Sequence, residues 1–325
     1  MNQVAKFAQI NEEKTNFDGI YTSDDPRKYF SRLGELDYII PHLAQPIIEQ
    51  VIRARSAVQA EPVTVLDLGC SYGVNGALMK YAVSFDSLQQ RYIAPTLQQL
   101  SCEELLVLDQ AYYRSWPRND RVRVIGLDIS ESAVRYAQQC GTVDVGLAAN
   151  LETRDPDPDE TAALADVDLI VSTGCVGYVT NRTFERLAKV TRRGRPAWVV
   201  SFVLRMFPYD RIAATLDDLG LTTEKFEGAT FVQRRFASRE EMEAAVRAVE
   251  GRGIDSRGHE AEGLYHADLY ISRPPEEAER CPIQKLVSVV SGANKPWIVG
   301  THLLGSFGQV ARRRARNRVT LAPAP

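Results

Sequence analysis

The sequence has few cysteines and histidines, and neither residue type is spaced for a metal site. The five cysteines are Cys70, Cys102, Cys140, Cys175 and Cys281, and no two of them form a CxxC pair. An odd number without that spacing indicates neither a disulfide framework nor a zinc site. The four histidines form no pair at metal-ligand spacing. We therefore expect no bound metal, and a reducing, cytoplasmic location.

Long hydrophobic runs and a strong net charge are missing as well. No run of about 18 apolar residues occurs, which excludes a membrane-spanning helix, and the polar start of the chain is unlike a signal peptide. Lys and Arg number 39 against 42 Asp and Glu, so the net charge is only −3. Bulk electrostatic attraction to nucleic acid is therefore absent. These counts point away from membranes and nucleic acid as partners.

The chain divides into three parts. Residues 1–60 combine aromatic and turn-forming residues with apolar positions at helical spacing, broken by two prolines, and predict a cap or lid of short helices. Residues 61–273 alternate strands and helices. Within them, the segment 82–120 is too long for an ordinary connection between a helix and a strand, and it predicts a helical insertion at the far end of the sheet. Residues 274–325 form an extension whose arginine-rich tail we expect to be solvated and dispensable.

Short apolar, β-branched runs mark the strands of the central part. The predicted strands cover 63–68, 122–128, 143–147, 167–172, 196–203, 230–236 and 265–272. Strands that alternate with helices are typical of a parallel sheet covered on both faces. The sequence therefore predicts an α/β, Rossmann-like fold with seven strands, mostly parallel.

A glycine-rich turn follows the first predicted strand. Residues 69–76 read GCSYGVNG and lead into a predicted helix. Gly69 and Gly73 let the backbone pass close to a ligand, and the first N–H groups of the helix can donate to it. Asp128 ends the second strand at the same edge of the sheet, where its carboxylate can accept from a ribose diol. Together these features predict a nucleoside site.

Two details argue against a dinucleotide. Ser71 stands where the G-x-G-x-x-G pattern has the glycine that lets a pyrophosphate approach. Asp67 would place a carboxylate beside that anionic pyrophosphate, whereas it would favour a cation. S-adenosylmethionine (SAM) carries an adenine, a ribose and a charged amine, and therefore fits the pattern better.

Three motifs resemble those of class I SAM-dependent methyltransferases. Residues 65–73 (VLDLGCSYG) look like the first motif of that family, and residues 126–130 (GLDIS) look like its ribose-binding motif. Residues 166–174 (DVDLIVSTG) are similar to the strand that floors the site. The resemblance covers about residues 60–273, and it implies the methyltransferase fold with SAM as cofactor.

The resemblance also implies a set of SAM-binding residues. Asn150 and Leu151 would contact the adenine, and Thr173 and Gly174 would line the methionine side. The complete set is Arg27, Tyr29, Asp67, Gly69, Cys70, Ser71, Gly73, Asn75, Asp128, Ile129, Asn150, Leu151, Thr173 and Gly174. Within it, Arg27 and Tyr29 come from the lid and are candidates to bind the carboxylate of SAM.

Three further residues are candidates for catalysis. Tyr178 follows the fourth strand, where its phenol could orient a substrate or hold a sulfonium by cation–π attraction. Its alternative role is packing beneath the loop. Tyr21 belongs to the aromatic group of the lid, whose alternative role is a hydrophobic anchor. Ser201 lies late in the fifth strand and faces either the pocket or the core.

Three functions follow from the resemblance. The main prediction is methyl transfer to a small molecule in biosynthesis, because no Asn-Pro-Pro-Tyr motif for a nucleic-acid amine follows the fourth strand. The N-terminal segment and the overall layout are also similar to azetidine-2-carboxylate synthases, which cyclise SAM and release methylthioadenosine. The third is a SAM-binding regulator without catalysis. The sequence leaves a homodimer open.

Overall fold

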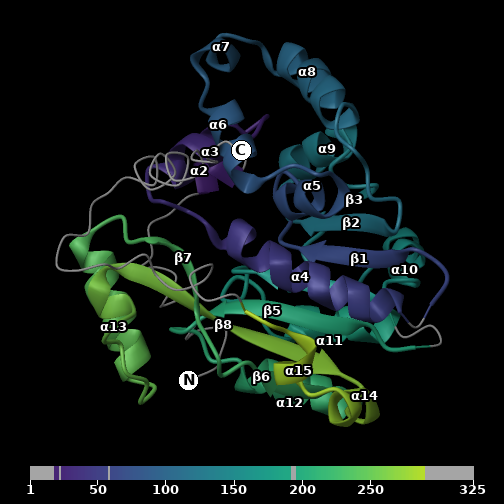
Figure 1. The fold of residues 1–325 in the computed structure, drawn as a ribbon, viewed down its shortest axis with the longest axis vertical. Helices are drawn as coiled ribbons and strands as arrows, with labels where there is room; N and C mark the ends of the chain where they lie inside the picture. The colour runs from purple at the N-terminus through teal and green to yellow at the C-terminus, as the bar shows by residue number, and fades with distance from the viewer. Residues whose placement is uncertain (1–17, 22, 58, 192–194, 290–325) are drawn as a thin grey trace, which may run out of the picture.

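The protein is described here by a computed structural model, which covers residues 18–21, 23–57, 59–191 and 195–289 (Figure 1). The predicted arginine-rich tail lies outside the described residues, as do Phe17 and the side chain of Tyr21. The backbone of Tyr21 is described and belongs to helix α2.

One mixed sheet organises the described part of the chain. Its strands follow the order β3-β2-β1-β4-β5-β8-β6, and β7 also pairs with β8. The first five positions are parallel, and β8 runs antiparallel to β5. The strands are β1 (Val63–Leu68), β2 (Val122–Asp128), β3 (Val145–Ala148), β4 (Leu169–Thr173), β5 (Trp198–Leu204), β6 (Thr222–Lys225), β7 (Phe231–Arg235) and β8 (Leu264–Arg273). This confirms the predicted Rossmann-like α/β fold.

The seventh position of the sheet is shared by two short strands. The long strand β8 pairs with β7 along its first half and with β6 along its second half. The sequence prediction included β7 but not β6, because the residues of β6 (TTEK) are polar and half-buried. A strand of four such residues carries neither an apolar run nor an alternating pattern, so pairing with β8 defines it.

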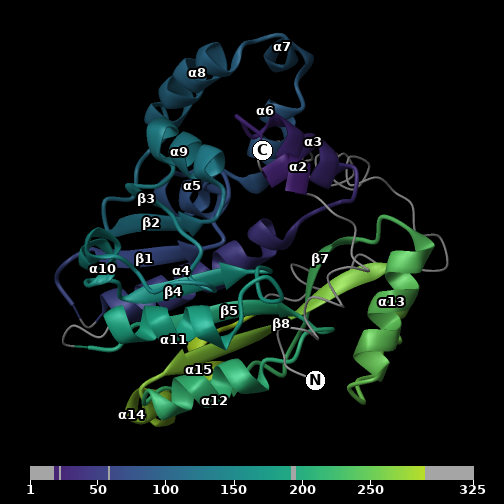
Figure 2. The same ribbon diagram turned by 180° about the vertical axis from the view of Figure 1, so that it is seen from behind.

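Helices cover both faces of this sheet. Helix α4 lies on one face, and α11 and α12 lie on the other, as Figures 1 and 2 show from opposite sides. The helices are α2 (Asp18–Tyr21), α3 (Arg27–Gly34), α4 (Ile40–Ser56), α5 (Val74–Lys80), α6 (Phe85–Tyr92), α7 (Pro95–Gln98), α8 (Cys102–Arg114), α9 (Glu131–Cys140), α10 (Pro158–Leu164), α11 (Asn181–Val190), α12 (Asp210–Asp218), α13 (Arg239–Glu250), α14 (Pro275–Arg280) and α15 (Ile283–Leu286), with a 3₁₀ turn at Glu260–Glu262.

Helix α4 differs from the broken helices that its prolines suggested. Pro41 lies in its first turn, where a missing N–H costs nothing, and Pro46 lies inside the helix. The helix continues through Pro46 because one face is buried in the main core, with Leu43, Ile47 and Val51 against the sheet. Packing therefore outweighs the local penalty of the proline.

A second hydrophobic core lies beside the first and joins three distant segments of the chain. It contains Tyr29, Phe30 and Leu33 of α3, together with aliphatic residues of α5 and aromatic residues of α6, α8 and α9. Phe30 stacks on Tyr92 with ring centroids 4.6 Å apart. Residues of α3 are thus buried in the interior, and removing residues 1–34 would uncover this core.

The predicted helical insertion consists of α6, α7 and α8. In both views α6 lies beside α2 and α3, and α8 extends toward α9 (Figures 1 and 2). The thiol of Cys102, at the start of α8, donates to the carbonyl of Asp24. The insertion therefore returns to the N-terminal segment instead of staying at the far end of the sheet.

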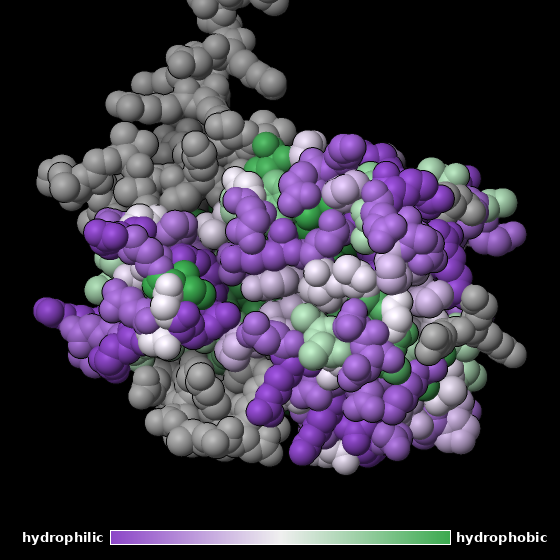
Figure 3. Space-filling model, turned by 90° about the horizontal axis from the view of Figure 1, so that it is seen from below, coloured by the Kyte–Doolittle hydropathy of each residue, from purple (hydrophilic) through white to green (hydrophobic). Residues whose placement is uncertain are grey.

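The surface seen from below in Figure 3 is mostly hydrophilic. Among the described residues on this face, hydrophobic side chains form small, separate areas. Within the described ranges, no helix is both long and apolar enough to span a membrane.

Candidate functional site

The glycine turn after β1 has a left-handed backbone at three positions. The φ angles are 77° at Gly69, 48° at Ser71 and 73° at Gly73. A Cβ on Gly69 would lie 2.8 Å from the Cβ of Cys175, and one on Gly73 would lie 2.2 Å from Oγ1 of Thr142. Close packing therefore requires both glycines. Ser71 adopts the same backbone at a cost on the order of 1 kcal/mol, and such residues cluster at functional sites.

Four residues near the carboxyl ends of β1 and β4 form a group that we call the polar cluster: Asp67, Ser71 and Asn75, which are buried, and Thr173, which is partly buried. Nδ2 of Asn75 donates to Oδ1 of Asp67 at 3.0 Å and to Oγ1 of Thr173 at 2.9 Å. Three buried oxygens of the cluster have no partner among the described residues, namely Asp67 Oδ2, Ser71 Oγ and Asn75 Oδ1. A buried oxygen without a partner is costly, so the cluster is suited to a ligand that donates several hydrogen bonds.

The charge of the polar cluster depends on Asp67. Burial raises the pKa of its carboxyl to about 7, and the Asp128 carboxylate adds to that rise, while the hydrogen bond from Asn75 opposes it. Among the residues that the structure describes, no cation is paired with Asp67 to offset its burial. The cluster is therefore suited to a cation that brings its own N–H donors, such as an ammonium group.

Asp128 ends β2 one strand away from Asp67. Its Oδ2 accepts from the backbone N–H of Ser71 at 2.9 Å, and its Oδ1 accepts from that of Ser130 at 3.0 Å. Each oxygen keeps a second lone pair, so the carboxylate is fixed in place and can still accept from a diol. Ile129, the next residue, is 75% exposed. A large apolar side chain beside a carboxylate suits a ligand whose sugar carries a flat base.

Asn150 and Leu151 follow β3 as predicted, but their side chains differ in access. Asn150 is exposed, and its Oδ1 accepts from the backbone N–H of Glu152 at 3.0 Å. Leu151 is buried in the main core, and its carbonyl accepts from Arg186 at 2.5 Å. The side chain of Leu151 is therefore directed into the interior, and only its backbone is near a ligand at this edge.

Neither cysteine of the site region is placed for chemistry. The thiol of Cys70 donates to the carbonyl of Ser71 at 3.5 Å and packs on Gly126, where a Cβ would lie 2.8 Å from its sulfur. Cys175 is hydrogen-bonded to the Ser172 hydroxyl at 3.0 Å. Burial raises the pKa of its thiol to about 12, which keeps the thiol protonated. Both residues serve packing.

The N-terminal segment is fastened to the glycine turn. The phenol of Tyr72 donates to the carbonyls of Ile20, at 2.9 Å, and Ser23, at 2.7 Å. Tyr29 is buried, and its ring centroid lies 6.0 Å from those of both Tyr38 and Tyr72. We call Tyr29, Tyr38 and Tyr72 the tyrosine group.

Tyr38 brings the tyrosine group next to the polar cluster. Burial raises the pKa of its phenol to about 12, and the Asp67 carboxylate contributes to that rise while a hydrogen bond with Tyr29 lowers it. The sequence analysis missed Tyr38 because it precedes α4, outside the aromatic cluster of residues 17–30. The electron-rich ring of Tyr38 adds to the preference of the Asp67 carboxylate for a cation.

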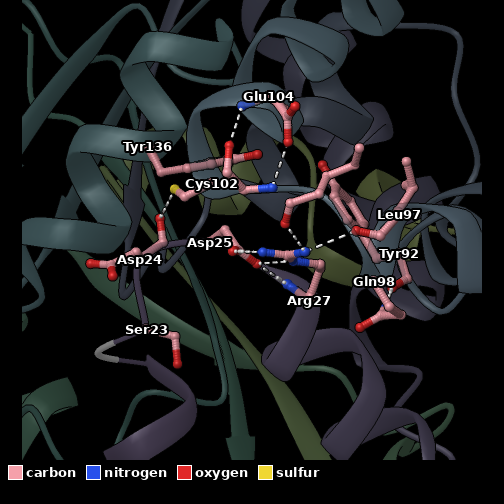
Figure 4. Close-up of polar contacts among 12 residues, drawn as sticks. Ser23, Asp24, Asp25, Arg27, Tyr92, Leu97, Gln98, Cys102, Glu104 and Tyr136 are labelled. Atoms are coloured by element: carbon pink, nitrogen blue, oxygen red, sulfur yellow. Dashed lines mark hydrogen bonds and ion pairs between the residues drawn. The ribbon is translucent and has the colours of Figure 1, made fainter.

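Arg27 has a different role from the one predicted. Its guanidinium donates to both carboxylate oxygens of Asp25, at 2.9 and 2.6 Å, and to the carbonyls of Leu97 and Leu100, each at 2.8 Å (Figure 4). All three of its nitrogens are thereby occupied. Arg27 holds the N-terminal segment against the insertion, and we do not include it among the ligand-binding residues.

An open cavity of about 590 Å³ lies beside this anchor, between the N-terminal segment and the insertion. Its lining includes Ser23, Asp24, Arg27 and Cys102, several of which Figure 4 shows. It shares no residue with the polar cluster, and its charged side chains have both signs. The cavity is therefore separate from the candidate site.

The catalytic candidates lie in two different environments. Tyr178 is 54% exposed in the loop between β4 and α11, at the same edge of the sheet as Thr173. Ser201 is fully buried in β5, where its hydroxyl accepts from Tyr209 at 3.2 Å. Tyr178 is thus accessible to a substrate, whereas Ser201 faces the core, the second of the two orientations that the sequence allowed.

Gln233 of β7 is a further residue that the sequence analysis missed. Its carboxamide lies so close to Gly174 that a Cβ there would be 2.2 Å from Nε2 of Gln233. Gly174 directly follows Thr173, a member of the polar cluster.

Within the described residues, no group of three or more His, Cys, Asp or Glu side chains could hold a metal ion.

Solved structures with a related fold are mostly methyltransferases. No protein-family model and no curated protein sequence matches the chain. Magnesium protoporphyrin IX methyltransferase from Synechocystis, with bound SAM, is 14% identical over 84% of this chain and 98% of that chain, with a TM-score of 0.35. The plantazolicin methyltransferase in complex with a monoazolic desmethylPZN analogue and S-adenosylhomocysteine (SAH) is 11% identical over 84% of this chain and 99% of that chain, with a TM-score of 0.40.

A third similar structure is the [4+2]-cyclase SpnF, 13% identical over 70% of this chain and 80% of that chain, with a TM-score of 0.34. All three likenesses are distant and concern the fold. The function is therefore argued from the residues of this chain.

Proposed function

We propose that the protein is an enzyme that binds SAM at the carboxyl edge of the sheet and uses it on a small molecule. The observation that carries the proposal is the polar cluster, which has three buried oxygens without a partner among the described residues, one of them on the Asp67 carboxylate beside the glycine turn. An ammonium group supplies both the positive charge and the N–H donors that the cluster lacks. A pyrophosphate would bring a negative charge to Asp67 instead.

The order of the strands supports an extended nucleoside ligand. Ile129 and Asp128 lie at the end of β2, Asp67 lies at the end of β1, and Thr173 lies at the end of β4, in the sheet order β2-β1-β4. An apolar surface, a diol acceptor and an ammonium site thus follow one another along a single edge. Adenine, ribose and the amino-acid end of SAM have the same order.

Methyl transfer is the main candidate reaction. Bound SAM supplies a methyl group on a positively charged sulfur, which passes to a nucleophilic atom of the acceptor while the carbon–sulfur bond breaks. The chain needs mainly to position the two reactants and exclude water, so no strong general base is required. Tyr178 is accessible at this edge, and we propose that it contacts the acceptor.

Cyclisation of SAM to azetidine-2-carboxylate is the second candidate, and the tyrosine group favours it. That reaction joins the amine nitrogen to the γ-carbon of the same molecule, breaks the bond from that carbon to sulfur, releases methylthioadenosine and gives a proton to solvent. Tyr38 interacts electrostatically with Asp67, and Tyr29 packs against both Tyr38 and Tyr72. Rings beside the amino-acid end would fold it back toward the sulfonium by cation–π attraction.

One experiment separates these possibilities. The protein is titrated with SAM by calorimetry and then incubated with SAM alone, and the products are analysed by mass spectrometry. Methylthioadenosine with a compound of the azetidine-2-carboxylate mass indicates cyclisation. SAH that forms only with an added acceptor indicates methyl transfer. Binding without either product indicates a regulator, and absence of SAM binding refutes the proposal.

Asp128→Ala should weaken SAM binding by roughly 10–150-fold. The variant removes acceptors for two ribose hydroxyls, and a hydrogen bond to a charged group contributes about 1.5–3 kcal/mol. Calorimetry measures the affinity, and thermal melting confirms the fold, because Asp128 also accepts from the backbone of Ser71 and Ser130. Asp120→Ala, at an exposed carboxylate outside the site, is the matched control. Unchanged affinity in a folded Asp128→Ala variant contradicts the ribose assignment.

A further inference from the structure

If the protein binds SAM as proposed, it must accommodate the carboxylate of the amino-acid end of SAM as well as its ammonium. The inference below therefore rests on the proposed function. The polar cluster offers unpartnered acceptors, which suit the ammonium. The arginine predicted to bind the carboxylate, Arg27, is occupied by Asp25 and two carbonyls. A side-chain donor for the carboxylate would therefore come from another element near Thr173.

Strand β7 has an irregularity at the position that faces this region. Val232 pairs with His266 and Arg235 with Leu264, so three steps along β7 match two along β8. The extra residue makes a bulge at residues 233–234. Bulges redirect side chains and are frequent beside active sites.

The bulge buries two consecutive side chains and fixes their backbone. Arg234 is paired with Glu241 by hydrogen bonds of 2.7 and 3.1 Å, so its charge is compensated. The carbonyl of Gln233 accepts from the backbone N–H of Ile39 at 2.9 Å. Gln233 is therefore held firmly while its side chain is directed toward β4.

The side chain of Gln233 is 5% exposed and lies against Gly174, where any larger residue would collide with its carboxamide. Among the described residues, none hydrogen-bonds to that carboxamide. A buried amide at the margin of the polar cluster thus has donor capacity that the protein itself does not use.

We propose that Gln233 recognises the carboxylate of the amino-acid end of SAM, opposite the ammonium site at Asp67. A neutral donor suits this position better than an arginine, because a second fixed cation would repel both the ammonium and the sulfonium of the same ligand. Gly174 lets the carboxamide approach the cluster, and the bulge of β7 aims it. Gln233 is a residue that binds the ligand and determines which amino-acid end is accepted.

The test compares three ligands that differ at the amino-acid end. SAM carries both groups, decarboxylated SAM keeps the ammonium and the sulfonium, and methylthioadenosine has neither the ammonium nor the carboxylate. Gln233→Met keeps the length of the side chain and removes its donor. We expect this variant to bind SAM roughly 10–100-fold more weakly, and the other two ligands within about twofold of the wild type.

Matched variants make the result specific. Asp67→Asn should weaken SAM and decarboxylated SAM together and leave methylthioadenosine unchanged. Gln233→Glu should weaken SAM further than Gln233→Met does, and should strengthen decarboxylated SAM because the new carboxylate attracts its ammonium. Gln139→Leu, at an exposed position of α9, controls for loss of a glutamine.

Two outcomes would overturn the inference. One is an equal loss of SAM and decarboxylated SAM affinity in Gln233→Met, which would show a structural role. The other is unchanged affinity for all three ligands in both Gln233 variants, with the fold intact by thermal melting. A wild-type protein that binds none of the three ligands refutes the proposed function itself.

Discussion

Asp67→Asn should make the ligand-free protein more stable at pH 8 than the wild type. Burial raises the pKa of the Asp67 carboxyl from 3.8 to about 7. Between these values the folded state holds a proton that the unfolded state has lost, so the free energy of unfolding falls as pH rises from about 4 to 7. Above pH 7 the folded protein bears the full cost of a buried, ionised Asp67. A rise of about three units in its pKa corresponds to a loss of roughly 4 kcal/mol in the free energy of unfolding. An amide remains neutral throughout and avoids it.

Thermal melting across pH checks this expectation. The difference in melting temperature between Asp67→Asn and the wild type should be large at pH 8 and shrink toward pH 5, where the wild-type carboxyl is protonated. Asp120→Asn, at an exposed carboxylate, should show no such pH dependence. A variant less stable than the wild type at pH 8 would mean that Asp67 has a partner that compensates its charge.

The same substitution should nearly abolish SAM binding. Removing one partner of a buried ion pair costs about 3–5 kcal/mol, which corresponds to a loss of affinity of roughly 150–4,000-fold. For the wild type, affinity should fall about tenfold per pH unit below pH 7, since protonated Asp67 no longer neutralises the ammonium. Calorimetry between pH 5.5 and 8.5 measures this, and a flat wild-type profile would argue against the ammonium site.

Asp109→Ala should cause the largest loss of stability in the second core. Asp109 is fully buried in α8, and its carboxylate accepts from Arg91 at 2.7 and 3.0 Å, from Tyr92 at 2.6 Å and from Tyr136 at 2.7 Å. Without it, a cation and two phenols lose their partner, which costs about 3–5 kcal/mol. For a chain of this size we expect the melting temperature to fall by roughly 10 °C.

The control for Asp109→Ala is Asp86→Ala, which removes an exposed carboxylate from the first turn of α6. It should lower the melting temperature by only about 1–2 °C, the effect of a charge near a helix end. Equal effects of the two substitutions would show that the buried carboxylate does not hold the insertion to α9.

Local sequence patterns were sufficient for most of the fold. The bounds of β1 and β2 were predicted without error because apolar, β-branched runs coincide with buried strands. The continuity of α4 through Pro46 was harder to predict. The penalty of the proline is visible in the local sequence, whereas the burial against the sheet that compensates for it depends on the tertiary fold. Strand β6 left no signal, because its polar residues are ordered by β8 alone.

Predicting the candidate site was harder, because several of its contacts join residues far apart in sequence. Asp67, Asn75 and Asp128 were identified since each stands in a motif at a strand end. Tyr38 and Gln233 were not, because their positions depend on contacts between segments about 200 residues apart. Arg27 was assigned to the carboxylate of SAM because of its charge, whereas its guanidinium is paired with Asp25 and with two carbonyls of the insertion.

The contact between residues 36–39 and β7 has a consequence for association between molecules. The N–H of Ile39 donates to the carbonyl of Gln233, and the N–H of Arg235 donates to the carbonyl of Leu36. These groups lie on the side of β7 that faces away from β8, so the chain covers its own unpaired strand edge. Exposed edges invite strands of other molecules and promote aggregation. Along β7, a second molecule could extend the sheet only after residues 36–39 had been released.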